Sequence, residues 1–121
     1  MAGMEAARAS SEFRASSTDV NGLTGVAVSG ELDYATCDRL SVALQEASDH
    51  DRESVLLDLG ECTFVDSMGV GVIVEAATRL AASGRKLVVC NVHGQVRKML
   101  RLTGLVVLDG LLVYSDCPSD G

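Results

Sequence analysis

The chain has 121 residues with 10 basic and 17 acidic side chains, which gives a formal net charge of −7. This balance argues against a nucleic-acid partner, because affinity for a phosphate backbone comes from Lys and Arg, and two Phe, two Tyr and no Trp offer little surface for stacking on bases. The hydrophobic content of 47% is too high for a disordered chain, so one acidic domain is expected.

The N-terminal residues carry no predicted targeting signal. Residues 1–10 are small and polar and are expected to form a flexible tail, with Glu5 where a signal peptide would be apolar. No run of 18 apolar residues occurs in the sequence, so membrane insertion is not expected. These features predict a cytoplasmic protein.

A hairpin and a helix are predicted next along the chain. Strands are expected at 13–17 and 23–29, on either side of a turn that contains the hairpin signal Asn21-Gly22. Residues 30–33 (Gly-Glu-Leu-Asp) are expected to break the second strand. Apolar residues with helical spacing then predict a helix over 34–48.

Strands and helices alternate in the rest of the chain. Buried parallel strands are short and almost wholly apolar, and this pattern is found at 54–59 and 86–92, while one or both of 105–108 and 111–114 form a final strand. Helical spacing predicts helices over 67–83 and 95–103, which Gly84 and Gly104 are placed to end. A loop is expected at 60–66.

The predicted order of elements is therefore ββαβαβαβ, which indicates an α/β fold. Strands separated by helices imply parallel pairing, so we expect a mixed, mostly parallel sheet of four or five strands with three helices packed against it. This single domain should span 11–115, between an N-terminal tail at 1–10 and a C-terminal tail at 116–121.

Two loops should lie at the edge formed by the carboxyl ends of the strands, where such sheets bind their ligands. The first is Gly30-Glu31-Leu32-Asp33, in which Asp33 stands where a helix N-cap would be. The second contains Asp66, Ser67, Gly69 and Gly71 at the start of a helix, where the dipole favours negative charge. On spacing alone, an N-cap role for Asp66 or Ser67 is the simpler interpretation.

Enzymatic and metal-binding interpretations have weaker support. A serine hydrolase needs G-x-S-x-G, but position 65 is Val, and only residues such as His93 could complete a triad. Gly69-Val70-Gly71 lacks the further residues of a dinucleotide or phosphate loop. The acidic residues Asp58, Glu61 and Asp66 are more simply explained as a solvated surface than as a cation site.

The four cysteines do not predict a metal site. They are scattered without a C-x-x-C pair, at positions Cys37, Cys62, Cys90 and Cys117. Only two histidines could join them as ligands, so zinc has little support. We expect four free thiols, no metal and no cofactor.

The loop motifs, taken together, resemble those of a known family. Gly30-Glu31-Leu32-Asp33, then the run from Phe64 to Val72 (FVDSMGVGV), then Leu100 to Leu105 (LRLTGL), are similar to the STAS domain and, more narrowly, to bacterial anti-sigma factor antagonists. Such proteins are not enzymes. They bind an anti-sigma factor that is also a serine kinase, phosphorylation by this kinase blocks binding, and a serine phosphatase restores it.

Carried onto this chain, the resemblance implies that Ser67 is the phosphorylated residue. It also implies that the partner surface comprises Glu31, Asp33, Asp66, Met68 and Gly69. Met68 stands where the family often has a second Ser or Thr, which leaves Ser67 as the only hydroxyl of the motif. A closing helix common in the family is not expected here, because residues 115–121 are few and include Pro118.

Two alternative functions stay open at this point. The domain could be a STAS subunit of a membrane transport or larger signalling complex with Ser67 unmodified. More remotely, Ser67 could serve a small hydrolase. The oligomeric state and the identity of the sigma factor are not predicted.

Overall fold

The order of elements is ββαβαβαβ, as predicted. The computed structural model describes residues 12–50, 53–104 and 110–114. Its strands are β1 (Arg14–Val20), β2 (Leu23–Leu32), β3 (Val55–Val65), β4 (Leu87–Cys90) and β5 (Leu111–Val113), and its helices are α2 (Cys37–His50), α3 (Ser67–Ala81) and α4 (Gly94–Leu102). The predicted tails, the strand proposed at 105–108 and the expected lack of a closing helix concern residues outside the described part of the chain.

The strands form one mixed sheet in the order β1-β2-β3-β4-β5. β1 and β2 are antiparallel, and the remaining neighbours are parallel. The hairpin signal is confirmed, because Asn21 and Gly22 both adopt positive φ, at 55° and 83°, as a two-residue turn between right-twisted strands requires.

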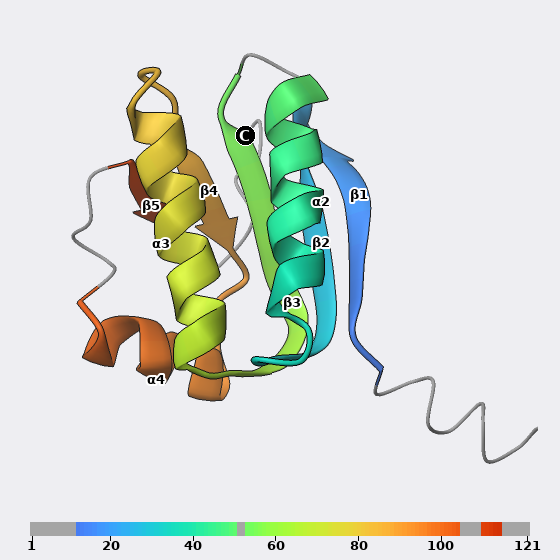
Figure 1. Cartoon of the computed structure of the whole chain (residues 1–121), viewed down its shortest axis with the longest axis vertical. Coiled ribbons are helices and arrows are strands. Elements are labelled where there is room, and N and C mark those ends of the chain that lie inside the picture. The colour runs from blue at the N-terminus through green and yellow to red at the C-terminus, as the bar shows by residue number, and fades with distance from the viewer. Residues whose placement is uncertain (1–11, 51–52, 105–109, 115–121) are drawn as a thin grey trace, which may run out of the picture.

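Two helices cover one face of this sheet. Figure 1 shows α2 and α3 side by side in front of the strands, with α4 at the end of the molecule where α3 begins. Apolar residues at helical spacing, including Leu40, Leu44 and Ile73, are fully buried against strand residues such as Val26 and Val28. Burial of each large aliphatic side chain contributes about 1.5–3 kcal/mol, which explains why the sequence periodicity located these helices correctly.

Both central strands are longer than predicted. β2 continues to Leu32 and β3 to Val65, so the expected strand break at 30–33 and the loop at 60–66 are wrong. The pairing passes through register shifts, one of them at Gly30, whose φ is +87°. The physical reason for the extension is burial: Leu32 and Val65 are 0% exposed and lie opposite each other in the parallel register, and their backbone groups have hydrogen-bond partners.

A smaller apolar cluster lies apart from the main core. It contains Leu56, Val88 and Cys90, with Val20 and Leu23 packed against it. Cys90 is disulfide-bonded, so the expectation of a free thiol is wrong at this position, because scattered sequence spacing gives no information on disulfide pairing. Cys37 and Cys62 are free and buried.

No helix among the described residues is long and apolar enough to cross a membrane.

Candidate functional site

The two predicted loops emerge next to each other because β2 and β3 end together. Leu32 pairs with Val65 in the parallel register, and the backbone N–H of Asp66 donates to the carbonyl of Leu32 at 3.1 Å. Residues that follow the two strands therefore start from the same edge of the sheet. This juxtaposition brings the predicted site residues of both loops to one end of the molecule.

Asp66 links the two loops through its carboxylate. Oδ1 accepts a hydrogen bond from the N–H of Gly69 at 2.9 Å, which makes Asp66 the N-cap residue of α3. Oδ2 accepts from the N–H of Tyr34 at 3.1 Å. Of the two candidates for the cap, the structure therefore selects Asp66 and not Ser67.

Ser67 is the first residue of α3 and is exposed. Within the described part of the chain, no hydrogen bond occupies its hydroxyl. The side chain thus stands at the positive end of the helix dipole without a structural task in the fold. A negatively charged group is favoured at such a position.

The two glycines of the motif differ in their surroundings. A Cβ at Gly69 would lie 2.7 Å from Cγ of Leu32 and 2.7 Å from Cγ2 of Val65, so close packing of α3 on the sheet explains this residue. A Cβ at Gly71 would meet nothing within 4 Å. Packing within the chain therefore does not explain Gly71, although an exposed glycine in a helix costs about 1 kcal/mol relative to Ala.

Asp33 orders the turn that leads into α2, where its carbonyl accepts from the N–H of Cys37 at 2.8 Å. Its Oδ1 accepts from the N–H of Ala35 at 3.0 Å, and its own N–H donates to Oγ1 of Thr36 at 2.9 Å. The Thr36 hydroxyl in turn donates to the carbonyl of Glu31 at 2.9 Å. These bonds form a turn, so α2 begins at Cys37, three residues later than predicted. The role of Thr36 was missed, although its spacing from Asp33 is a capping pattern.

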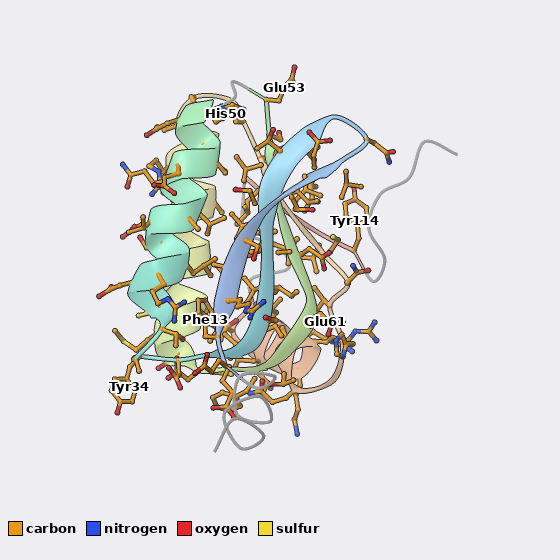
Figure 2. All side chains as sticks on the ribbon, turned by 90° about the vertical axis from the view of Figure 1, so that its right-hand side faces the viewer. Phe13, Tyr34, His50, Glu53, Glu61 and Tyr114 are labelled. Carbon is orange, nitrogen blue, oxygen red and sulfur yellow. The ribbon has the colours of Figure 1, made fainter. Side chains whose placement is uncertain are left out.

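Exposed apolar and acidic side chains occur in both of the segments that meet at Asp66. Tyr34 is 75% exposed and Met68 is 54% exposed, and Figure 2 shows Tyr34 projecting from the body near the start of α2. Glu31 is exposed and Asp33 is half-buried. The site is thus an acidic surface that also carries an exposed Tyr and an exposed Met, two residue types that are enriched in protein interfaces.

Gln95, at the start of α4, also contacts this region. Its Oε1 accepts from the N–H of Val65 at 3.0 Å, and its Nε2 donates to the carbonyl of the same residue at 3.0 Å. No sequence pattern indicated this contact, because the two residues are 30 positions apart and Gln is common on helix surfaces.

The structure does not assemble the alternative sites. Nε2 of His93 lies 2.9 Å from the carbonyl oxygen of Gly60 and has no hydrogen bond to Ser67. Oδ1 of Asp58 accepts from Gly60 and Asn91. Across residues 12–50, 53–104 and 110–114, no group of three or more His, Cys, Asp or Glu side chains is placed to hold a metal ion.

Cys62 is not an activated nucleophile. The residue is 0% exposed, and burial raises the pKa of its thiol above the ordinary value of 9.0. A thiol with a raised pKa stays protonated near neutral pH and reacts slowly.

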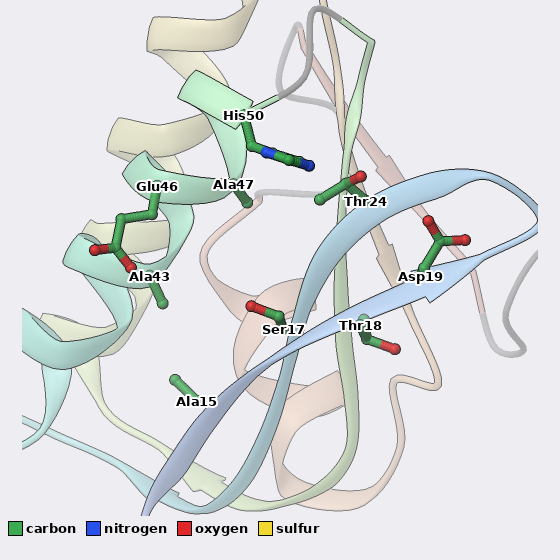
Figure 3. Close-up of a pocket in the computed structure, with 9 residues that line it drawn as sticks. All are labelled: Ala15, Ser17, Thr18, Asp19, Thr24, Ala43, Glu46, Ala47 and His50. Atoms are coloured by element: carbon green, nitrogen blue, oxygen red, sulfur yellow. The ribbon is translucent and has the colours of Figure 1, made fainter.

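A surface depression lies away from the Ser67 loops. It has a volume of about 580 Å³ and is lined by residues of α2 and the β1–β2 hairpin, including Ser17, Thr24, Glu46 and His50 (Figure 3). None of its lining residues belongs to either loop of the candidate site.

Comparisons with known proteins agree with this description. Residues 15–115 match the family model described as the STAS domain. An anti-sigma F factor antagonist of Paenibacillus polymyxa is 34% identical over 85 residues, which cover 69% of this chain and 73% of the relative. The crystal structure of an anti-sigma factor antagonist from Mycobacterium paratuberculosis is similar with a TM-score of 0.73 and 24% identity, over 84% of this chain and 86% of that chain. SpoIIAA from Bacillus in its phosphorylated form has a TM-score of 0.61 and 18% identity, over 84% and 90%.

Proposed function

The chain belongs to the STAS domain family, and from this premise we propose that it is an anti-sigma factor antagonist switched by phosphorylation of Ser67. In its unphosphorylated form the protein binds an anti-sigma factor that is also a serine kinase, and the sigma factor is thereby released. Phosphate on Ser67 blocks this binding, and a serine phosphatase restores it. Sigma factors act in the cytoplasm, which is therefore the expected location.

The observation that carries the proposal is the environment of the Ser67 hydroxyl. Ser67 is exposed, its neighbour Asp66 performs the capping, and no described residue bonds to the hydroxyl. A kinase that adds phosphate here breaks no hydrogen bond of the fold. The helix terminus also favours the added charge, so the monomer should keep its structure after modification.

The same phosphate would oppose binding, because a complex would enclose it beside carboxylates of its own chain and remove the water that screens their charges. Phosphorylation adds about −1.5 to −2 charges at pH 7, beside Asp66 and close to the acidic loop that contains Asp33. Two like unit charges 4 Å apart repel by about 4 kcal/mol at an effective dielectric of 20. Inverting a binding equilibrium from 99:1 to 1:99 takes about 5.5 kcal/mol. Repulsion together with the bulk of the phosphate is therefore sufficient for a switch.

The surroundings of Ser67 favour a protein partner. Tyr34 and Met68 are the large apolar side chains that such a surface would bury. Glu31 and Asp33 would accept hydrogen bonds from polar groups of the anti-sigma factor. Gly71 lies one helical turn after Ser67 and leaves the backbone of α3 open to close approach.

The proposal is tested by incubating the protein with MgATP and each purified anti-sigma factor of the organism that encodes it. Mass spectrometry should place one phosphate on Ser67. Ser67→Ala should abolish labelling, whereas Ser17→Ala, which removes an exposed serine on β1, should not change it. Labelling that persists in Ser67→Ala would refute the assignment. No labelling or binding by any anti-sigma factor would instead favour a STAS subunit of a transport or signalling complex.

A further inference from the structure

One side of β3 has no strand neighbour over much of its length within the described residues. β4 pairs with β3 only from Val55 to Asp58, whereas β3 continues to Val65. Backbone groups that point to this side beyond Asp58 need other hydrogen-bond partners, because buried N–H and C=O groups are costly when unpaired.

Two side chains at the start of α4 supply such partners. The Nε2 atom of His93 lies 2.9 Å from the carbonyl oxygen of Gly60. Gln95 binds both the N–H and the C=O of Val65 at 3.0 Å each. A carboxamide has both an N–H donor and a C=O acceptor, as a peptide group does, so Gln95 takes the place of a neighbouring strand at this one residue.

Val65 is the last residue of β3 and lies two positions before Ser67. Its side chain is 0% exposed. The next residue, Asp66, caps α3 and accepts a hydrogen bond from the N–H of Tyr34. We propose that Gln95 is a positioning residue for Ser67. By fixing the Val65 peptide groups, it holds the Asp66 carboxylate in register with Gly69 and Tyr34, and so presents the Ser67 hydroxyl in one geometry. The kinetic part of this inference rests on the proposed function, and its structural part does not.

The chain offers a matched control for this proposal. His93→Leu removes a side-chain contact from α4 to β3, as Gln95→Met does, but at Gly60, seven residues before Ser67. Gln95→Glu retains an acceptor for the N–H of Val65 but sets a carboxylate oxygen against its carbonyl oxygen, so its effect should be at least as large as that of Gln95→Met. Gln95 and His93 are both exposed, which favours folding of all three variants.

The structural part is tested by NMR without any partner. The amide signals of Gly69 and Tyr34 report on the two hydrogen bonds to Asp66. In Gln95→Met, both amides should shift and exchange with solvent about tenfold faster than in the wild type. They should be unchanged in His93→Leu. Gly69 and Tyr34 amides that are the same in Gln95→Met and the wild type would overturn the proposal.

The kinetic part uses the anti-sigma factor that phosphorylates the wild-type protein. Misplacement of the hydroxyl should lower kcat/KM for Ser67 phosphorylation about tenfold in Gln95→Met, at least as much in Gln95→Glu, and not measurably in His93→Leu. An equal loss in the Gln95 and His93 variants would show a general effect of stability and overturn the positioning role. If no anti-sigma factor labels the wild type, the proposed function is refuted, while the NMR comparison still decides the structural part.

Discussion

Oδ2 of Asp66 accepts a hydrogen bond from the backbone N–H of Tyr34 at 3.1 Å, across 32 positions of sequence. The other carboxylate oxygen caps α3 through Gly69. One side chain therefore connects the loop after β2 with the helix that begins at Ser67. The geometry around Ser67 depends on this bridge.

The bridge predicts that Asp66→Ala destabilises the fold. Loss of the cap and of the Tyr34 contact should lower the free energy of unfolding by about 1–3 kcal/mol. Urea denaturation followed by circular dichroism measures this change. Asp19→Ala is the control, because Asp19 accepts a hydrogen bond from Gly22 at 3.1 Å in an exposed turn. A loss in Asp66→Ala no larger than in Asp19→Ala would contradict the bridging role.

Replacement of the two glycines of α3 by alanine should change the stability of the fold in opposite directions. Gly69→Ala places a methyl group 2.7 Å from Leu32 and Val65 and should destabilise the fold by about 1–3 kcal/mol. Gly71→Ala meets open space and should stabilise the helix by about 0.5–1 kcal/mol. The thermal unfolding midpoint should be lower than that of the wild type in Gly69→Ala and higher in Gly71→Ala.

Gly71→Ala should also weaken binding of the anti-sigma factor although it stabilises the free protein. Calorimetric titration against the wild type measures this effect. A variant that is more stable and binds equally well would remove Gly71 from the proposed interface.

Truncation of the exposed apolar side chains tests the proposed surface. Tyr34→Ala and Met68→Ala should each weaken binding of the anti-sigma factor by about 1–3 kcal/mol and leave the unfolding midpoint almost unchanged, since both side chains are exposed. Val42→Ala is the matched control, because Val42 is 58% exposed on α2 and lies away from both loops. Equal binding by all three variants would place the interface elsewhere.

The buried Cys62 thiol predicts a dependence of stability on pH. Burial raises the pKa of Cys62 in the folded state above the ordinary value of 9.0, so the thiol ionises first in the unfolded chain. Its contribution is fully present below that ordinary value and is lost as pH rises toward the raised pKa. Between about pH 8 and about pH 10, the wild type should therefore lose more unfolding free energy than Cys62→Ala. Equal losses of unfolding free energy in the wild type and Cys62→Ala, measured under non-reducing conditions, would contradict this expectation.

The sequence predicted the elements whose signal is local. The helical periodicity of α3 located its start at Ser67, and Asn21-Gly22 located the hairpin. The ends of β2 and β3 were wrong, because Gly30 and Gly60 are typical of loops, whereas the strands continue through irregular register to reach buried Leu32 and Val65. Local composition cannot show that a neighbouring strand keeps such a segment paired.

The candidate site was predictable in its residues but not in its connections. The motif indicated Asp33, Asp66 and Ser67, and the parallel order of strands placed both loops at one edge. The division of tasks, with Asp66 capping and Ser67 unoccupied, follows from side-chain geometry that spacing leaves open. Long-range contacts such as that between Gln95 and Val65 have no local pattern, so only the structure identifies them.

The most direct test of the account is the affinity of the anti-sigma factor for the protein with and without phosphate on Ser67, measured by calorimetric titration. The account predicts tight binding of the unmodified protein and binding at least about 100-fold weaker after phosphorylation, which corresponds to about 2.7 kcal/mol. Circular dichroism should show that both forms are folded. Equal dissociation constants for the two folded forms would contradict the switch.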